Sequence, residues 1–165
     1  MKQIDNTGSI LCELQADTFV KAAEKLSCSS EIFIRRFMNS ISAVILDSDY
    51  VLNEIMTPES IIEQINEQYG PSSYGQVKYT ADELFWIGYI YRYFAYTYGI
   101  SSTRAYRIIK PKELRQLYPA YHTMDCASAI ERILEAREIV LDNNIDYQYR
   151  VFRMVREKSG YIHTK

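Results

Sequence analysis

Apolar residues recur along most of the chain at the three- and four-residue steps of an amphipathic helix, and the alternation typical of strands is nearly absent. The first such segment covers residues 10–26, and the second covers residues 31–46 after a short polar break. In the second segment Phe33, Phe37 and Ile41 form one apolar stripe. The pattern predicts an N-terminal helical hairpin over residues 10–46.

The clearest helix signal lies at the centre of the chain, over residues 80–98. Thr80 and Glu83 have the spacing of a capping box, and Gly99 is a typical C-terminal stop. Between these ends, apolar and aromatic side chains cover nearly the whole circumference, as in a helix that other helices surround. We therefore expect a buried central helix with Trp86 in the core.

Shorter helices are expected on both sides of the central helix. Pro58 follows Thr57 at a first helical position, which predicts a helix over residues 58–68 after a connector. Four further helices are predicted over residues 101–109, 112–118, 127–140 and 146–158. Pro119 should end the second of these, because proline lacks the amide hydrogen that helix hydrogen bonds need.

The sum of these elements is an all-α fold of seven or eight helices. A chain of 165 residues has about the size of one domain. We therefore assign residues 1–165 to a single domain, with a helical core over residues 58–158 behind the N-terminal hairpin. Apolar residues make up 47% of the chain and charged residues 24%, a balance that excludes a disordered chain.

Charge is distributed unevenly between the two halves of the chain. Residues 1–84 hold 6 Lys and Arg against 13 Asp and Glu, and residues 85–165 hold 13 against 8. The net charge of the whole chain is only −2, so the total does not mark a nucleic-acid binder. Each half nevertheless contains one cluster of like charge that could bind a partner.

Three glutamates of the acidic half fall on one side of the helix predicted over residues 58–68. Glu59, Glu63 and Glu67 are spaced four residues apart, so successive turns present them on one face. Like charges at this spacing mildly oppose helix formation, and the stripe serves either solubility or the binding of a basic partner. We take it as the candidate partner-binding surface.

A run of basic residues follows the central helix, with Glu113 as the only acid among them. Its members are Arg104, Arg107, Lys110, Lys112 and Arg115. The run is either a solvated face that pairs in part with the acidic half or a site for a phosphate or an acidic partner.

The chain offers little for metal or cofactor chemistry. It has no Gly-rich phosphate loop, and its two histidines, His122 and His163, lie 41 residues apart, so no metal site and no cofactor are predicted. Its three cysteines are widely spaced and odd in number, which favours a reducing, cytoplasmic compartment. The most apolar stretch contains Arg92, and we expect it to be a buried helix and not a membrane span.

Two alternatives assign a nucleic-acid function to the chain. The spacing of Arg115 and His122 resembles the motif of HEPN-type ribonucleases, small all-α proteins in which Arg and His act on the scissile phosphate. Pro119 is expected to break the helix that should carry both residues, which counts against this alternative. In the other alternative, the first two predicted helices form a helix-turn-helix, and Arg35 and Arg36 contact DNA.

A wider resemblance covers about residues 84–135. It rests on an aromatic helix, a short helix that begins with serine, and a Tyr-x-x-Tyr-His-Thr step before the next helix. The segments that carry it are residues 96–102, 105–106, 117–118, 121–123 and 129–134. They resemble a small bacterial family of helical domains encoded beside ADP-ribosyltransferase-like proteins, in an arrangement like a toxin–antitoxin pair.

This resemblance implies an antitoxin-like protein without catalysis of its own, which binds and neutralises a protein partner such as an ADP-ribosyltransferase-like toxin. We therefore expect a non-catalytic protein-binding module. Binding of nucleic acid is a less favoured alternative. The sequence does not decide whether the chain forms a homodimer.

Overall fold

The computed structural model describes residues 1–48 and 56–141, and these residues form eight α-helices and no strand. In chain order the helices are α1 (Asn6–Lys25), α2 (Ser30–Met38), α3 (Ile41–Asp47), α4 (Pro58–Tyr69), α5 (Ala81–Tyr98), α6 (Ser102–Ile108), α7 (Pro111–Tyr121) and α8 (Cys126–Ala136). The fold is all-α, as the sequence predicts. The helix predicted over residues 146–158 lies outside the described residues.

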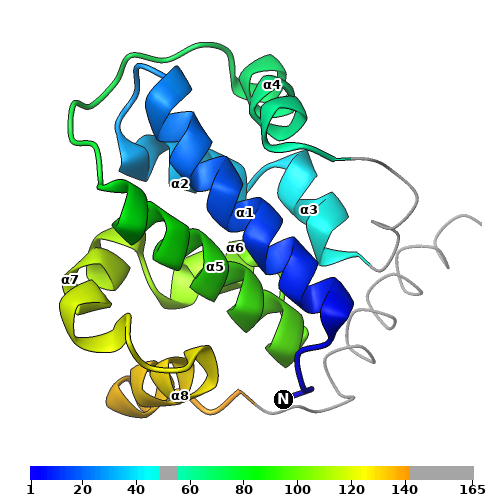
Figure 1. Ribbon diagram of the computed structural model, residues 1–165, viewed down its shortest axis with the longest axis vertical. Coiled ribbons are helices and arrows are strands. Elements are labelled where there is room, and N and C mark those ends of the chain that lie inside the picture. Colours follow the sequence, from blue (N-terminus) through cyan, green and yellow to red (C-terminus); the bar gives the residue numbers. More distant parts are fainter. Residues whose placement is uncertain (49–55, 142–165) are drawn as a thin grey trace, which may run out of the picture.

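The two longest helices, α1 and α5, lie side by side at the centre of the fold (Figure 1). Helices α2 and α4 pack against α1, while α6, α7 and α8 pack against α5. Ile87, Tyr91 and Phe94 of α5 are buried, and Trp86 is only 8% exposed. The buried Tyr91 hydroxyl donates a hydrogen bond to the Ile109 carbonyl oxygen at 2.7 Å. The predicted buried central helix is thus confirmed.

The ends of α5 are formed as the sequence indicates. The Thr80 hydroxyl oxygen accepts from the Glu83 amide at 3.2 Å, and the Glu83 carboxylate accepts from the Thr80 amide at 2.9 Å. Gly99 ends the helix in the left-handed region, at φ 62° and ψ 36°, which glycine adopts without strain. Thr57 and Ser60 form a similar reciprocal cap at the start of α4.

Helices α1 and α5 can approach closely because Gly88 of α5 faces α1. A Cβ atom at this position would lie 2.8 Å from the Ala16 Cα and 3.0 Å from the Gln15 carbonyl oxygen. Both are backbone atoms, so neither can turn away in the manner of a flexible side chain. The absence of a side chain at Gly88 therefore sets the distance between the two central helices.

We expect Gly88→Ala to lower the free energy of unfolding by about 1–3 kcal/mol, because the added methyl group forces the two central helices apart. Alanine has the better helix propensity by about 1 kcal/mol, which opposes this loss without cancelling it. Urea denaturation measures the effect, and Gln116→Ala at an exposed site of α7 is the control. A Gly88→Ala variant as stable as the wild type would contradict the close approach.

The N-terminal half departs from the predicted hairpin over residues 10–46. Helix α1 begins at Asn6 because the Asp5 carboxylate caps it, accepting from the Gly8 amide at 2.8 Å. The predicted second helix is two helices, α2 and α3. The Ser40 hydroxyl donates to the Phe37 carbonyl oxygen at 2.7 Å and accepts from the Ala43 amide at 3.1 Å, so one serine ends α2 and caps α3.

Helix α7 continues through Pro119 to Tyr121, so the predicted stop at this proline is wrong. Pro119 cannot donate to the carbonyl oxygen of Arg115, but it lies on an exposed side of the helix, where water can bind that oxygen. The next turn still forms, because the His122 amide donates to the Tyr118 carbonyl oxygen at 3.0 Å.

Helix α8 ends at Ala136 and not at residue 140 as predicted. Glu138 adopts a left-handed φ of 54°, a conformation that ends a helix. The Ile139 amide then donates to the Leu134 carbonyl oxygen at 3.0 Å, which closes the last turn. No glycine marks this helix end in the sequence, so the predicted helix extended too far.

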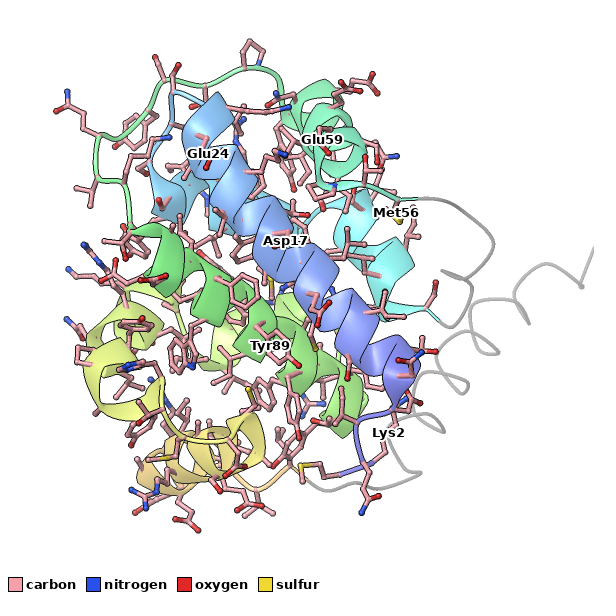
Figure 2. The ribbon with its side chains drawn as sticks, viewed as in Figure 1. Lys2, Asp17, Glu24, Met56, Glu59 and Tyr89 are labelled. Carbon is pink, nitrogen blue, oxygen red and sulfur yellow. The ribbon has the colours of Figure 1, made fainter. Side chains whose placement is uncertain are left out.

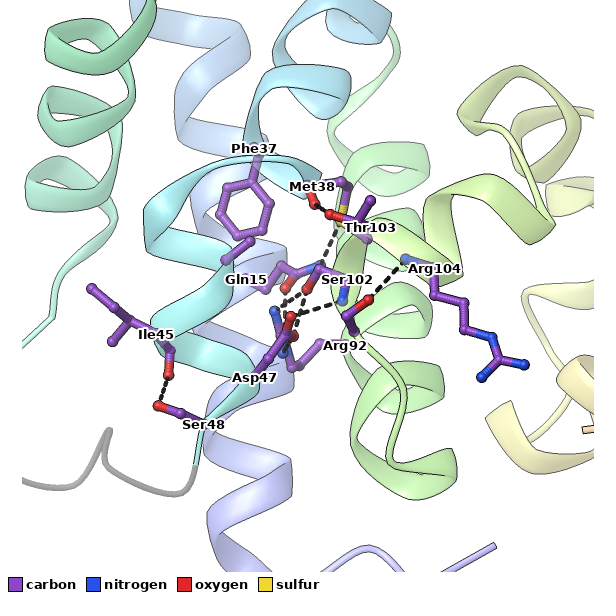
Figure 3. A network of polar contacts seen from close by, with 12 residues as sticks. Gln15, Phe37, Met38, Ile45, Asp47, Ser48, Arg92, Ser102, Thr103 and Arg104 are labelled. Carbon is purple, nitrogen blue, oxygen red and sulfur yellow. Dashed lines mark hydrogen bonds and ion pairs between the residues drawn. The ribbon is translucent and has the colours of Figure 1, made fainter. Parts of the chain in front are cut away.

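A buried network around Arg92 joins α1, α3, α5 and α6 (Figure 3). The Arg92 side chain is 1% exposed and donates to the Asp47 carboxylate at 2.6 Å. It also donates to the Gln15 amide oxygen and the Ser102 hydroxyl, both at 2.8 Å. The second Asp47 oxygen accepts from the Ser102 amide at 2.8 Å, so the network fixes the start of α6 as well.

Candidate protein-interaction surface

The predicted acidic stripe lies on the solvent side of α4. Ile61, Ile62 and Ile65 of this helix are buried, which turns the opposite face outward. Glu63 and Glu67 are exposed on that face. Their neighbour Glu59 binds the Lys21 ammonium of α1 at 2.7 Å. This hydrogen bond is the main reason that the pKa of Glu59 lies below its ordinary value.

Helix α1 extends the acidic stripe across its contact with α4. The hydrogen bond from Lys21 to Glu59 raises the pKa of Lys21, and the charges of Glu59, Glu24 and Asp17 raise it further. Figure 2 shows Asp17 and Glu24 along the visible side of α1, with Glu59 near them on α4. Three carboxylates from two helices therefore surround one lysine.

We define the acidic surface as these carboxylates together with the rest of the α4 stripe. Its members are Asp17, Glu24, Glu59, Glu63 and Glu67. Two lysines of α1, Lys21 and Lys25, lower the pKa of Glu59, and Lys78 binds the Ala23 carbonyl oxygen at 3.1 Å, so five carboxylates stand against three lysines. The acidic surface therefore keeps a negative potential that a basic partner can meet.

The predicted basic run is divided between α6, α7 and the turn that joins them. The Lys110 ammonium lies 3.9 Å from the centroid of the Tyr106 ring, a cation–π contact. Arg107 and Lys112 are exposed, and Arg104 is half-buried. The run is therefore spread over several elements, and part of it is engaged in contacts within the chain.

Arg115, the last member of the run, faces α5. Its Nε donates to the Glu83 carboxylate at 3.1 Å, and its guanidinium lies 4.3 Å from the centroid of the Tyr79 ring. The Tyr79 hydroxyl in turn donates to the Glu31 carboxylate at 2.7 Å. In this arrangement Arg115 links α7 to α5, and its charge is paired with an acid from the N-terminal half.

The structure places Arg115 and His122 on the same side of α7, since the helix is not broken between them. Seven residues correspond to two helical turns, or about 10 Å along the axis. His122 Nδ1 is 2.8 Å from the Tyr118 carbonyl oxygen, and since a carbonyl only accepts, we assign the ring hydrogen to Nδ1. No helix break therefore separates Arg115 from His122, which removes this objection to a HEPN-like arrangement, although Arg115 is paired with Glu83.

The two arginines proposed for DNA binding differ in their surroundings. Arg36 donates to the Gly70 carbonyl oxygen at 2.6 Å and so fixes the end of α4 to α2. Arg35 is exposed. In a helix-turn-helix the N-terminal residues of the second helix reach the bases. Here a loop covers that end of α2, because the Ser30 amide donates to the Val77 carbonyl oxygen at 3.0 Å.

A groove of about 380 Å³ with aromatic walls lies between α5 and α7. Its lining residues are Asp82, Phe85, Trp86, Tyr89, Tyr118 and His122. We call it the aromatic groove. The sequence analysis missed it because the aromatic residues of α5 were taken as core, and nothing local shows that α7 lies opposite them.

Two stacked pairs of rings form the walls of the aromatic groove. Phe85 and Tyr89 stack at a centroid distance of 6.2 Å and an interplanar angle of 27°. Tyr118 and His122 stack at 4.5 Å and 22°. Trp86 meets the Tyr118 ring edge-on at 5.8 Å, and it is largely buried. Trp86 therefore supplies the floor between the two walls.

Cys12 and Cys126 are poor candidates for nucleophilic chemistry. Burial raises the pKa of Cys12 to about 12 and that of Cys126 to about 11. Both thiols stay protonated near neutral pH, and a thiol attacks only as the thiolate. Within residues 1–48 and 56–141, no three His, Cys, Asp or Glu side chains are grouped so that they could hold a metal ion.

Among the helices that the structure describes, none combines the length and the apolar character needed to cross a membrane. Comparison of the chain with protein-family models, with curated proteins and with solved structures gives no match. The features of this chain that bear on its function are therefore the acidic surface, the aromatic groove and the residue pattern over residues 84–135.

Proposed function

We propose that the chain is a non-catalytic protein-binding module, the antitoxin-like member of a bacterial toxin–antitoxin pair. The observation that carries the proposal is the acidic surface, in which α1 and α4 expose four carboxylates beside Glu59, which is paired with Lys21. A surface of one charge sign attracts an oppositely charged partner over a distance and increases the rate of association. The pairing of Arg115 with Glu83, and the burial that raises the pKa of Cys12 and of Cys126, support a role without catalysis.

The partner that fits is a protein with a basic, concave site. A toxin that uses a nucleotide must bind phosphate groups, and Arg and Lys are the usual groups for that purpose. An acidic surface can cover such a site and compete with its substrate. An ADP-ribosyltransferase-like toxin belongs to this class, and the resemblance over residues 84–135 implies the same partner. We place the pair in the cytoplasm, where free thiols such as Cys12 and Cys28 stay reduced.

Affinity purification from the native operon tests this proposal. The tagged wild-type protein should co-purify with the product of a neighbouring gene. The triple variant Glu59→Gln, Glu63→Gln and Glu67→Gln should recover less of it at low salt, because the long-range attraction is weaker. The matched control removes three exposed charges elsewhere, with Glu131→Gln, Glu135→Gln and Glu138→Gln in and after α8. Recovery of no partner by the wild type, or equal losses in the two triple variants, would contradict the proposal.

A HEPN-like ribonuclease is the second candidate function, because α7 runs without a break from Arg115 to its C-cap residue, His122. Under the non-catalytic proposal His122 is structural, since its ring stacks on Tyr118. We expect His122→Ala to lower the melting temperature by about 2–4 °C, which corresponds to about 1 kcal/mol in a chain of this size. Incubation with total RNA is the deciding test. Specific cleavage by the wild type that both His122→Ala and Arg115→Ala abolish would establish the ribonuclease and overturn the non-catalytic proposal.

A further inference from the structure

We propose that the aromatic groove binds the guanidinium group of an arginine side chain that a protein partner inserts between α5 and α7. The groove lies outside the acidic surface, and the sequence analysis assigned it no role. This inference rests on the proposed function, because the occupant belongs to the protein partner. It names the anchor residue that the partner would supply.

The shape of the groove suits a flat group on an extended chain. Its walls are the Phe85–Tyr89 pair from α5 and the Tyr118–His122 pair from α7, with Trp86 as the floor. A guanidinium is planar and stacks on aromatic faces, and the aliphatic stem of arginine adds apolar contact. A groove of about 380 Å³ is large enough for both parts of the side chain.

The charges around the groove favour a cation. The face of an aromatic ring is negative, so rings attract an ammonium or guanidinium placed over them. Asp82 adds a carboxylate to the lining, and this exposed side chain has no ion pair within the described residues. Arg115 of α7 does not line the groove and is paired with Glu83. A phosphate in the groove would meet the Asp82 carboxylate, and no lysine or arginine is among the lining residues.

The position of the groove also suits a partner that the acidic surface attracts. Tyr89 of the groove lies on the side of the molecule that carries Asp17, Glu24 and Glu59 in Figure 2. Helices α1 and α5 form the most extensive contact of the fold, so the acidic surface and the groove belong to adjoining helices. A basic protein drawn to α1 and α4 can therefore place one arginine in the groove. Buried arginine and aromatic anchors typically carry much of the energy of such interfaces.

Trp86 is the only tryptophan of the chain, so its fluorescence reports on the groove directly. The probes are N-acetyl-arginine amide and its neutral isostere N-acetyl-citrulline amide, titrated into the full-length protein at constant ionic strength. We expect a saturable change in Trp86 emission with the arginine probe, with a dissociation constant on the order of 10 mM or below. The citrulline probe should bind at least about fivefold more weakly, since it lacks the charge.

Two variants localise the binding. Asp82→Asn and Phe85→Ala should each weaken the arginine probe several-fold, while Glu138→Gln at an exposed site after α8 should leave it unchanged. Circular dichroism should show that all three variants keep their helices. Equal binding of citrulline and arginine, a non-saturable response, or saturation by inorganic phosphate in place of arginine would overturn the inference.

The probe titration needs no partner, so its failure is distinct from failure of the proposed function. If the arginine probe binds but no partner co-purifies, the groove is a guanidinium-binding site and the antitoxin-like role fails. If a partner co-purifies equally with the wild type and with Phe85→Ala, the groove is not part of that interface and the inference fails.

Discussion

Replacing Asp47 with alanine should lower the free energy of unfolding by about 3–5 kcal/mol, the range for the loss of one partner from a buried ion pair. Arg92 is 1% exposed, whereas the Asp47 side chain is 16% exposed and meets it from α3. Without this carboxylate the guanidinium keeps only the uncharged Gln15 and Ser102 as partners. A buried charge without a counterion is costly because water cannot replace the lost partner.

Urea denaturation of matched variants separates this effect from simple truncation. Asp17→Ala removes an exposed aspartate of α1 and should change stability by no more than about 0.5 kcal/mol. The double variant Asp47→Leu with Arg92→Met should recover part of the loss, since it removes the unpaired charge as well. If Asp47→Ala costs no more than Asp17→Ala, the network of Figure 3 does not hold the helices together.

Trp86→Ala should also cost about 3–5 kcal/mol, the range for truncating a large buried aromatic side chain. Trp86 is 8% exposed, belongs to the core cluster and touches Tyr118, so alanine would leave a cavity between α5 and α7. Its neighbour Phe85 provides the control, because it belongs to the same helix but is 40% exposed.

The comparison of these two variants tests the placement of the central helix. Phe85→Ala should lose well under half as much free energy of unfolding, since the loss scales with the apolar area taken from water. Chemical denaturation with far-UV circular dichroism measures both. Similar losses in the two variants, or a loss below about 1 kcal/mol for Trp86→Ala, would place this side of α5 at the surface.

Features that depend on neighbouring residues could be predicted from the sequence. The reciprocal cap of Thr80 and Glu83, the stop at Gly99 and the start of α4 at Pro58 are all found as expected. The stripe of Glu59, Glu63 and Glu67 follows from helical spacing once α4 is established. Local hydrogen bonds and helical periodicity determine these features, and both are visible within a few residues.

The predictions from sequence were wrong at positions where one side chain can have either of two roles. Ser40 reads as an ordinary polar residue of a helix, yet its hydroxyl ends α2 and caps α3. Pro119 is typical of a helix end, yet α7 continues through it, because the exposed turn around Pro119 tolerates the loss of one backbone hydrogen bond. In each case the outcome depends on competition between local hydrogen bonds and tertiary packing, which a residue pattern does not resolve.

Contacts between distant segments could not be predicted. Arg92 was recognised as a charge within an apolar stretch, but its partners Asp47 and Gln15 lie 45 and 77 residues away in the chain. The aromatic groove joins α5 to α7, and the acidic surface joins α4 to α1. The packing of the helices decides which of their faces meet. A single sequence does not reveal that packing.

The most direct test of the proposed function is the association rate of the purified partner at several salt concentrations, measured by stopped flow. The wild-type rate constant should fall about tenfold or more from low to high ionic strength, because salt screens the acidic surface. The variant with Glu59→Gln, Glu63→Gln and Glu67→Gln should associate several-fold more slowly at low salt and at the wild-type rate at high salt. An unchanged rate for this variant at low salt would show that the acidic surface does not guide the partner.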